Sequence, residues 1–471
     1  MRHNSYRSTP VDTDRMPPGI GNILVNEAAE RFAFYGFRAI LVVYMTRYLL
    51  DRSGAVAPMN EESAKAWSHW FLSATYALPV VGALLSDIWL GKYRTIIGFS
   101  LLYCLGLFAV VVDRTQMGLL AALGLVAVGS GIIKPCVSAN VGDQFGSSNR
   151  HLLAPIYNWF YFAINLGAFV SMLLTPWLLD WGVRRYGIPG AGRLAFGVCA
   201  ALMVVATAAF WMGRWKFVHV PAGGWSFVRD TLSKEGLWVL AKLSVVYLFV
   251  FPFWALFDQT TAAWVLQAEK MNLQWLPDGL VQRLPGSMQS WGTVLPAQLT
   301  SVNSILILLM IPLFNYLIYP AVNRVWRLTP LRKIGAGLFV AAGSFVICAF
   351  VEKQIGAGAQ PNVWWQVLAY VIITAAEILV SITALEFSYA QAPKRMKSFV
   401  MAIFLLSISL GNAFAAAVNE WIRPADGPPR LQGAAYYWFF VWFMLVTAVL
   451  FVPVAMAYRG KTYTQDEMNT G

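Results

Sequence analysis

The chain has 471 residues, of which 58% are hydrophobic and only 12% charged. A soluble domain is about 25% charged, so this composition favours lipid as the solvent over a soluble domain or an unusually hydrophobic subunit of a soluble complex. The formal net charge is +12, and the basic residues stand in short loops between apolar stretches. Because these loops form no long basic run and no aromatic-basic platform, the sequence predicts no nucleic-acid partner.

The first twenty residues are polar and lack the apolar core and cleavage site of a secretory signal, so we expect the first helix to insert and remain. Segments apolar and long enough to cross a bilayer follow at about 22–50, 68–88, 93–112, 117–139, 153–180, 192–214, 236–266, 295–322, 332–352, 362–391, 396–421 and 434–458. Cytoplasmic termini would give the inside loops about nineteen Lys and Arg against about eleven outside, although Arg184, Arg185 and Arg193 oppose this orientation. The sequence therefore predicts about twelve transmembrane helices with both termini in the cytoplasm.

A polar stretch with Pro221, Gly223 and Gly224 separates the sixth and seventh segments and is too short to hold extra inserted helices. We expect two six-helix bundles with a binding site between them, as in many secondary transporters. The predicted parts are an N-terminal tail over 1–21, an N-terminal bundle over 22–214, a linker over 215–235, a C-terminal bundle over 236–458 and a C-terminal tail over 459–471.

The first and fourth segments carry charges inside apolar runs, where a charge at the membrane centre costs about 3 kcal/mol or more. Glu27, Glu30 and Arg31 share one helix face at i, i+3 and i+4 spacing. Two acids beside one base leave a spare carboxylate, which is a natural proton carrier; the alternative is an ion-pair cluster at the start of the helix. Lys134 needs an acidic partner such as Glu27 or Glu30, unless it reaches the membrane face by snorkelling.

The second half of the chain supplies acids. Asp258 lies four residues after Trp254, and Glu377 shares a helix face with Ser381. His69, at the outer end of the second segment, is either structural or a group that titrates near neutral pH. Bases in the first half and acids in the second would suit a zwitterionic ligand, with its carboxylate on the first half and its ammonium on the second.

Six motifs resemble those of the proton-dependent oligopeptide transporter family, within the major facilitator superfamily. The most specific is EAAERFAFYG over 27–36, which is similar to the family's E-x-x-E-R-F-x-Y-Y-G pattern. The others occur in the expected order and cover both halves: GALLSDIWLGKYRTI (82–96), GIIKPCVSANVGDQF (131–145), FYFAINLGA (160–168), FWALFDQ (253–259) and ALEFSYAQAP (384–393).

The resemblance implies roles for individual residues. Glu27, Glu30 and Arg31 would couple transport to protons, with Lys134 pairing with them. Arg38 and Lys134 would bind the peptide carboxylate, and Glu377 the peptide amino terminus. His69, Arg38 and Asp258 would form an extracellular gate and take up protons. The remaining substrate contacts would come from Tyr76, Tyr161, Asn165, Trp254, Asn303 and Ser381.

Two residues depart from the family pattern: Phe34 replaces the first tyrosine of the Tyr-Tyr pair, and Phe404 stands where many members have tryptophan. Both departures bear on side-chain specificity more than on mechanism. No role is assigned to the loop over 267–294.

The resulting prediction is a proton-coupled symporter of di- and tripeptides in the plasma membrane (the inner membrane in a bacterium), functional as a monomer. It is not an enzyme, because no His, Cys and Asp group has metal-ligand spacing and no nucleophile cluster is visible, and it needs no cofactor beyond the coupling protons. The alternatives are a carrier of nitrate or another small anion, a drug/proton antiporter and a non-transporting peptide sensor.

Overall fold

The computed structural model describes residues 6–222, 224, 234–283, 285–391, 397–423 and 429–458. Within these residues the secondary structure is helical, and the only β pairing is a set of isolated bridges. The chain divides into two compact units, the first formed by 1–58 and 71–237 and the second by 59–70 and 238–471. The predicted linker over 215–235 lies partly, and the tail over 459–471 wholly, outside the described residues.

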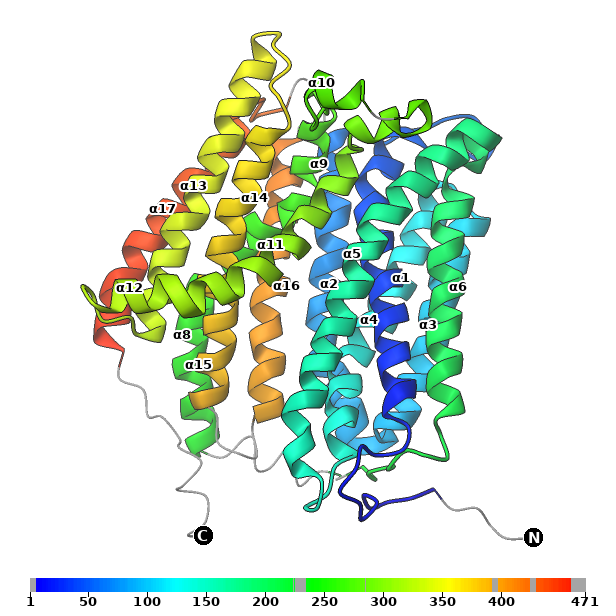
Figure 1. The fold of residues 1–471 in the computed structure, drawn as a ribbon, viewed down its shortest axis with the longest axis vertical. Coiled ribbons are helices and arrows are strands. Elements are labelled where there is room, and N and C mark those ends of the chain that lie inside the picture. Colours follow the sequence, from blue (N-terminus) through cyan, green and yellow to red (C-terminus); the bar gives the residue numbers. More distant parts are fainter. Residues whose placement is uncertain are drawn as a thin grey trace. The chain divides into compact units, whose positions relative to one another are not determined.

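The first unit contains the helices that are coloured from blue through cyan to the green of α6 in Figure 1. They are α1 (Ile20–Arg47), most of α2 (Glu61–Leu85), α3 (Lys92–Val112), α4 (Gln116–Asp143), α5 (Leu153–Tyr186) and α6 (Ala191–Met212). Helix α1 packs on α5 and α6, and α3 packs on α4 and α6. Glycine permits a close approach of α5 to α1: a Cβ atom on Gly167 of α5 would overlap the backbone oxygen of Ala28 on α1.

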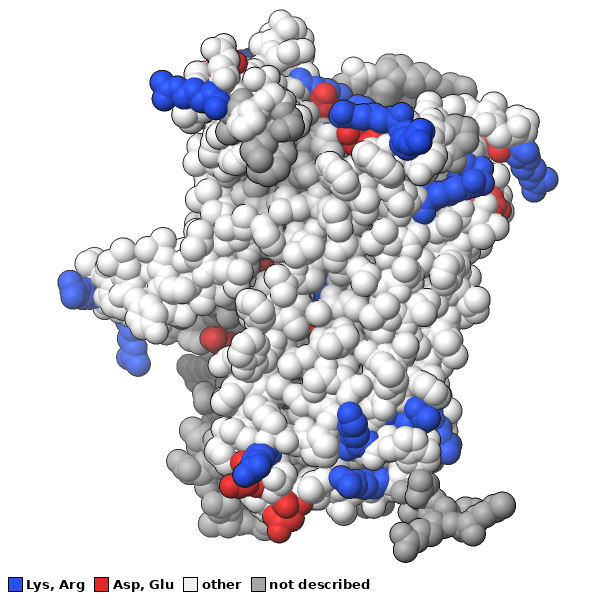
Figure 2. Space-filling model, turned by 45° about the vertical axis from the view of Figure 1, so that its right-hand side comes forward, with Lys and Arg blue, Asp and Glu red and all other residues white. Residues whose placement is uncertain are grey.

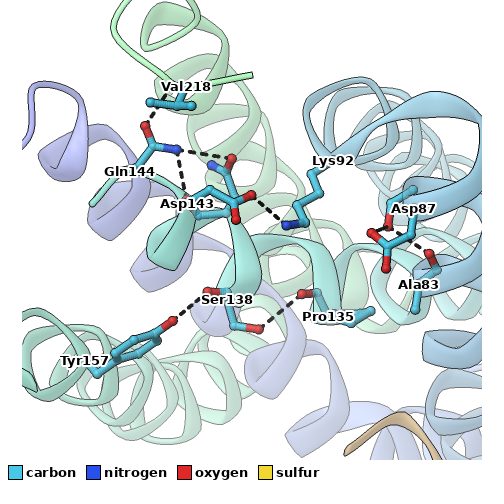
Figure 3. Close-up of polar contacts among 11 residues, drawn as sticks. Ala83, Asp87, Lys92, Pro135, Ser138, Asp143, Gln144, Tyr157 and Val218 are labelled. Atoms are coloured by element: carbon cyan, nitrogen blue, oxygen red, sulfur yellow. Dashed lines mark hydrogen bonds and ion pairs between the residues drawn. The ribbon is translucent and has the colours of Figure 1, made fainter. Parts of the chain in front are cut away.

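Polar contacts join the ends of several helices at one end of the first unit (Figure 3). Lys92, the first residue of α3, donates to Asp143 at the end of α4 over 2.6 Å. The next residue, Gln144, accepts a hydrogen bond from the backbone N–H of Val218, which follows α6. The motif at 82–96 therefore ties α2 and α3 to the end of α4.

The second unit contains α8 (Lys234–Phe257), α9 (Ala263–Ala268), α10 (Asp278–Val281), α11 (Thr300–Leu313), α12 (Tyr319–Asn323), α13 (Pro330–Gly356), α14 (Trp364–Glu377), α15 (Thr383–Gln391), α16 (Lys397–Ile422) and α17 (Ala434–Ala457). Short π-helical segments join α11 to α12 (Phe314–Ile318) and α14 to α15 (Ile378–Ile382). The first turns of α2 also belong to this unit.

Eleven helices among the described residues are long and apolar enough to cross a membrane. Helix α1 is a twelfth of suitable length, with 28 residues, but its buried residues include Glu27, Glu30 and Arg38. The predicted all-helical membrane fold with about twelve spanning helices is thus confirmed. On the face drawn in Figure 2, most charged side chains gather toward the top and the bottom of the view, and few lie between.

One predicted boundary was wrong: the second helix begins at Glu61 and not near residue 68. Its first turn is polar, so hydropathy alone does not detect it. Asn60 stabilises the start, because its side-chain oxygen accepts a hydrogen bond from the backbone N–H of Ser63.

Candidate functional site

The first unit holds a compact charge cluster on α1. The Arg31 Nε atom lies 2.7 Å from a carboxylate oxygen of Glu27 and 3.0 Å from one of Glu30. Both glutamates are 2% exposed. The i, i+3 and i+4 spacing places the three side chains on one face of the helix, as the sequence predicts. One guanidinium between two carboxylates leaves a net negative charge, so one of the two acids can bind a proton without leaving the arginine unpaired.

Lys134 of α4 lies between two aromatic rings in the same unit. Its Nζ atom is 4.1 Å from the ring centroid of Phe34 on α1 and 4.1 Å from that of Tyr76 on α2. It is also near enough to interact electrostatically with Glu30. Cation–π contacts of this kind are worth about 0.5–2 kcal/mol. They need the face of the ring and not its hydroxyl, so the phenylalanine at position 34 can hold the ammonium as a tyrosine would.

The other substrate residues predicted in the first unit lie on α1 and α5. Arg38 is buried, two turns beyond Arg31 on α1. Tyr161 is 45% exposed on α5. Asn165, one turn further along α5, donates its side-chain N–H to the backbone oxygen of Tyr161, which leaves its carbonyl oxygen as an acceptor. These positions stay predictions as substrate contacts.

In the second unit, Glu377 and Asn303 meet as a hydrogen-bonded pair. Asn303 of α11 donates to the Glu377 carboxylate over 2.8 Å and to the Thr374 hydroxyl over 3.0 Å. Both amide hydrogens of Asn303 are therefore used, so the carboxylate is held in one orientation while it remains partly exposed. Ser381 follows in the π-helical segment that begins directly after Glu377. Segments of this kind are frequent at functional sites.

His69, Asn412 and Asp258 form a buried chain of hydrogen bonds, also within the second unit. Asn412 of α16 donates its amide to Asp258 over 2.6 Å and to the backbone oxygen of Ile408 over 3.0 Å. The ring Nδ1 atom of His69 lies 2.8 Å from the Asn412 side-chain oxygen. Because both Asn412 hydrogens are already donated, His69 must be the donor in this contact, which places a proton on Nδ1. Sequence reasoning named His69 and Asp258 but missed Asn412, which joins them.

We expect Asn412→Leu to lower the free energy of unfolding by about 2–5 kcal/mol, since it removes a hydrogen-bond partner from two buried polar side chains. The measurement is thermal or denaturant unfolding of the purified protein in detergent, for Asn412→Leu, His69→Leu and the double variant. The double variant should cost clearly less than the sum of the single variants, because the two residues are coupled. Additive costs would show that the chain of hydrogen bonds is not a unit.

Trp254 of α8 is buried, and no described residue accepts a hydrogen bond from its indole N–H. Helix α16 passes close by: a Cβ atom on Gly411 would lie 2.5 Å from the Phe251 backbone oxygen and 2.8 Å from the Trp254 Cβ atom. Phe404, the other departure from the family pattern, contacts Tyr247 with ring centroids 5.9 Å apart. Asn412 directly follows Gly411, so the close contact of α8 with α16 fixes the position of the hydrogen-bonded chain.

The described residues contain no group of three or more His, Cys, Asp or Glu side chains placed to hold a metal ion. They do contain ionisable side chains buried in apolar, membrane-length helices, and such side chains in membrane proteins mark pathways for protons, ions and polar solutes. The fold and these clusters are those of a polytopic membrane protein, and buried ionisable groups of this kind are typical of transporters.

The chain belongs to the POT family, whose sequence pattern matches residues 93–243 and 227–439. It is 36% identical to peptide transporter family 1 of Drosophila melanogaster over 72% of this chain and 48% of that protein. It is 31% identical to human solute carrier family 15 member 1 over 72% of this chain and 52% of that protein. The chain therefore spans about half the length of the curated relatives that it matches. The family resemblance predicted from the motifs is confirmed.

Solved structures agree with this assignment. An auto-inhibited POT family peptide transporter shares 29% identity and a TM-score of 0.80 over 95% of this chain and 98% of its own. A proton-dependent oligopeptide family transporter shares 31% identity and a TM-score of 0.73 over 92% of this chain and 100% of its own. The family and the relatives named above are transporters, which agrees with the prediction that the chain is not an enzyme.

Proposed function

We propose that this protein imports di- and tripeptides together with protons, by alternating access. The observation that carries the proposal is the division of charge: a buried Glu27-Arg31-Glu30 cluster with Lys134 nearby in the first unit, and a Glu377-Asn303 pair in the second. A free peptide carries an anionic and a cationic end, which these two sets complement. The relatives named as peptide transporters support the same substrate class.

In the proposed binding mode, Lys134 and Arg38 bind the peptide carboxylate and Glu377 binds the amino terminus. Tyr76, Tyr161, Asn165 and Asn303 supply hydrogen bonds to the peptide backbone. Trp254 and Ser381 line the side-chain pockets. A nitrate ion has no cationic end, so the carboxylate of Glu377 favours a zwitterion over a small anion.

Protonation of Glu27 or Glu30 drives the cycle. With one acid neutralised, the attraction that holds Lys134 toward α1 weakens, and its ammonium is available for the peptide carboxylate. Inside the cell the lower proton activity removes the proton, Lys134 returns, and the peptide leaves. His69, Arg38 and Asp258 act as the outer gate and the path of proton uptake. The coupling needs no cofactor other than the proton.

The energetics suffice for nutrient uptake. One proton crossing 100 mV supplies about 2.3 kcal/mol, and one pH unit about 1.4 kcal/mol. Their sum corresponds to roughly 500-fold accumulation of a neutral zwitterion at one proton per peptide. We place the protein in the plasma membrane, with both termini in the cytoplasm and the monomer as the functional unit.

The experiment that tests this function is uptake of labelled dialanine into proteoliposomes with an imposed inward proton gradient and membrane potential. Concentrative uptake that a proton ionophore abolishes is the expected result. Movement of nitrate or a drug without any dipeptide would overturn the substrate assignment. Peptide binding without flux would indicate a sensor.

A further inference from the structure

A cavity of about 310 Å³ lies at one end of the second unit, apart from the Glu377-Asn303 pair. The residues around it come from the start of α2, from α9, from the last turns of α13 and from the first turn of α17, at the end where Figure 1 shows α13 and α14 meeting. Its charged lining consists of Glu61, Glu62, Lys65, Lys270 and Glu352, and Gln267 and Gln432 add side-chain amides. This volume is near the lower limit for small-molecule sites and far exceeds that of one water molecule.

Gln267 is one of the residues that line this cavity. Its side chain is 2% exposed and donates to the Cys348 backbone oxygen over 3.0 Å and to the Glu352 carboxylate over 2.7 Å. Both of these partners only accept, so the amide must point its nitrogen toward them. The Gln267 carbonyl oxygen is then buried and has no hydrogen-bond partner among the described residues. A buried acceptor left in this way costs about 1–3 kcal/mol, unless a bound donor satisfies it.

The charges around the cavity do not balance. Lys270 pairs with Glu61 over 2.9 Å. Lys65 is buried, with its Nζ atom 4.3 Å from the ring centroid of Tyr436, and it interacts electrostatically with Glu62. Glu352, directly beside Gln267, interacts electrostatically with both lysines, so three carboxylates share two ammonium groups and the cluster keeps one net negative charge. The missing partner is therefore a cation that also donates hydrogen bonds.

We propose that this cavity binds the primary ammonium group of a small molecule, either a free amine or the amino terminus of a peptide. An –NH₃⁺ group has three N–H donors and no acceptor, which matches the Glu352 carboxylate and the Gln267 carbonyl oxygen together. The face of the Tyr436 ring is already taken by Lys65. A bare metal ion fits less well, because no three acidic side chains of the described residues converge on one point.

The test is equilibrium binding of ethylammonium to the full-length protein in lipid nanodiscs, followed by calorimetry, with dialanine and N-acetyl-dialanine as further probes. Ethylammonium should bind the wild-type protein, whereas tetramethylammonium, which has no N–H donor, should not. Glu352→Gln should weaken ethylammonium binding at least tenfold. Asp278→Asn, which neutralises an exposed acid of the same unit outside the cavity, should leave it unchanged.

Glu377→Gln separates this site from the one proposed for transport. Ethylammonium binding that survives Glu377→Gln and is lost in Glu352→Gln supports the cavity, whatever the outcome of the uptake experiment. Loss in Glu377→Gln alone, or no binding to the wild-type protein, overturns the proposal and leaves a cavity that holds only water.

If Glu352→Gln does not fold, Glu62→Gln should weaken binding in the same assay through the loss of a second carboxylate. Dialanine that competes where N-acetyl-dialanine does not would identify a peptide amino terminus as an occupant.

Discussion

Glu30→Gln should abolish proton-driven accumulation of dialanine while leaving exchange of dialanine across the membrane intact. Glutamine has the shape of a protonated glutamate but cannot release a proton, so the cluster on α1 is held in its neutralised form. The inside-to-outside ratio under an imposed proton gradient and potential should fall from several hundred-fold toward about one. Exchange requires no net proton movement and should stay within about threefold of the wild-type rate. Both quantities can be measured in the same proteoliposome preparation.

Glu386→Gln is the matched control, since it makes the same chemical change at an exposed position of α15 outside the clusters described above. It should keep both driven uptake and exchange. If Glu30→Gln still accumulates dialanine, the proton is carried elsewhere, and the same assay on Glu27→Gln identifies whether the neighbouring acid carries it. Loss of exchange as well as accumulation would indicate a structural role for the Arg31 ion pairs.

Hydropathy and the charge pattern predict most of the fold of this protein, because the burial of apolar and charged side chains contributes its largest energies. A membrane-spanning helix needs about twenty apolar residues, so these helices can be identified from the sequence. A charge such as that of Glu30 or Lys134 inside an apolar helix is costly enough to stand out from its surroundings. The polar first turn of α2 carries no such signal, and its start at Glu61 was missed. The π-helical segment after Glu377 likewise has no sequence signature that hydropathy detects.

Asn412 illustrates why part of a site escapes sequence reasoning. A neutral asparagine in a helix costs much less than a charge, and Ser, Thr and Asn are common at helix contacts in membranes. Its importance comes from two partners that are 343 and 154 residues away in the chain, His69 and Asp258. The Gly411-Asn412 dipeptide offers a faint signal, because glycine allows the close approach that places the next side chain. The meaning of this dipeptide becomes clear only when the packing of α8 against α16 is known.

The contact of Lys134 with Phe34 likewise depends on helix packing that the sequence does not show. In the sequence, Phe34 lacks the hydroxyl that a tyrosine would supply. The structure shows that the face of the Phe34 ring contacts the Lys134 ammonium. What a tyrosine would add at this position is a hydrogen bond beyond the ring and not the contact itself. We therefore expect the ring, and not the hydroxyl, to position Lys134 beside Glu30.

Glu377→Gln should weaken dialanine binding about 10–100-fold, because it removes the negative charge that we propose binds the peptide ammonium. Glutamine can still accept the hydrogen bond from Asn303, so the local geometry is preserved and the substitution tests charge alone. The measurement is competition of unlabelled peptides against labelled substrate in exchange mode.

A matched pair of peptides makes the result specific to the amino terminus. N-acetyl-dialanine lacks the ammonium, so its competition should be weak in the wild-type protein and change by less than about threefold in Glu377→Gln. The preference for dialanine over its acetylated form should therefore collapse in the variant. Equal weakening of both peptides would place the peptide ammonium elsewhere and give Glu377 a structural role through Asn303 and Thr374. Glu377→Asp, which keeps the charge but shortens the side chain by one methylene, should retain most of the preference if charge is the determinant.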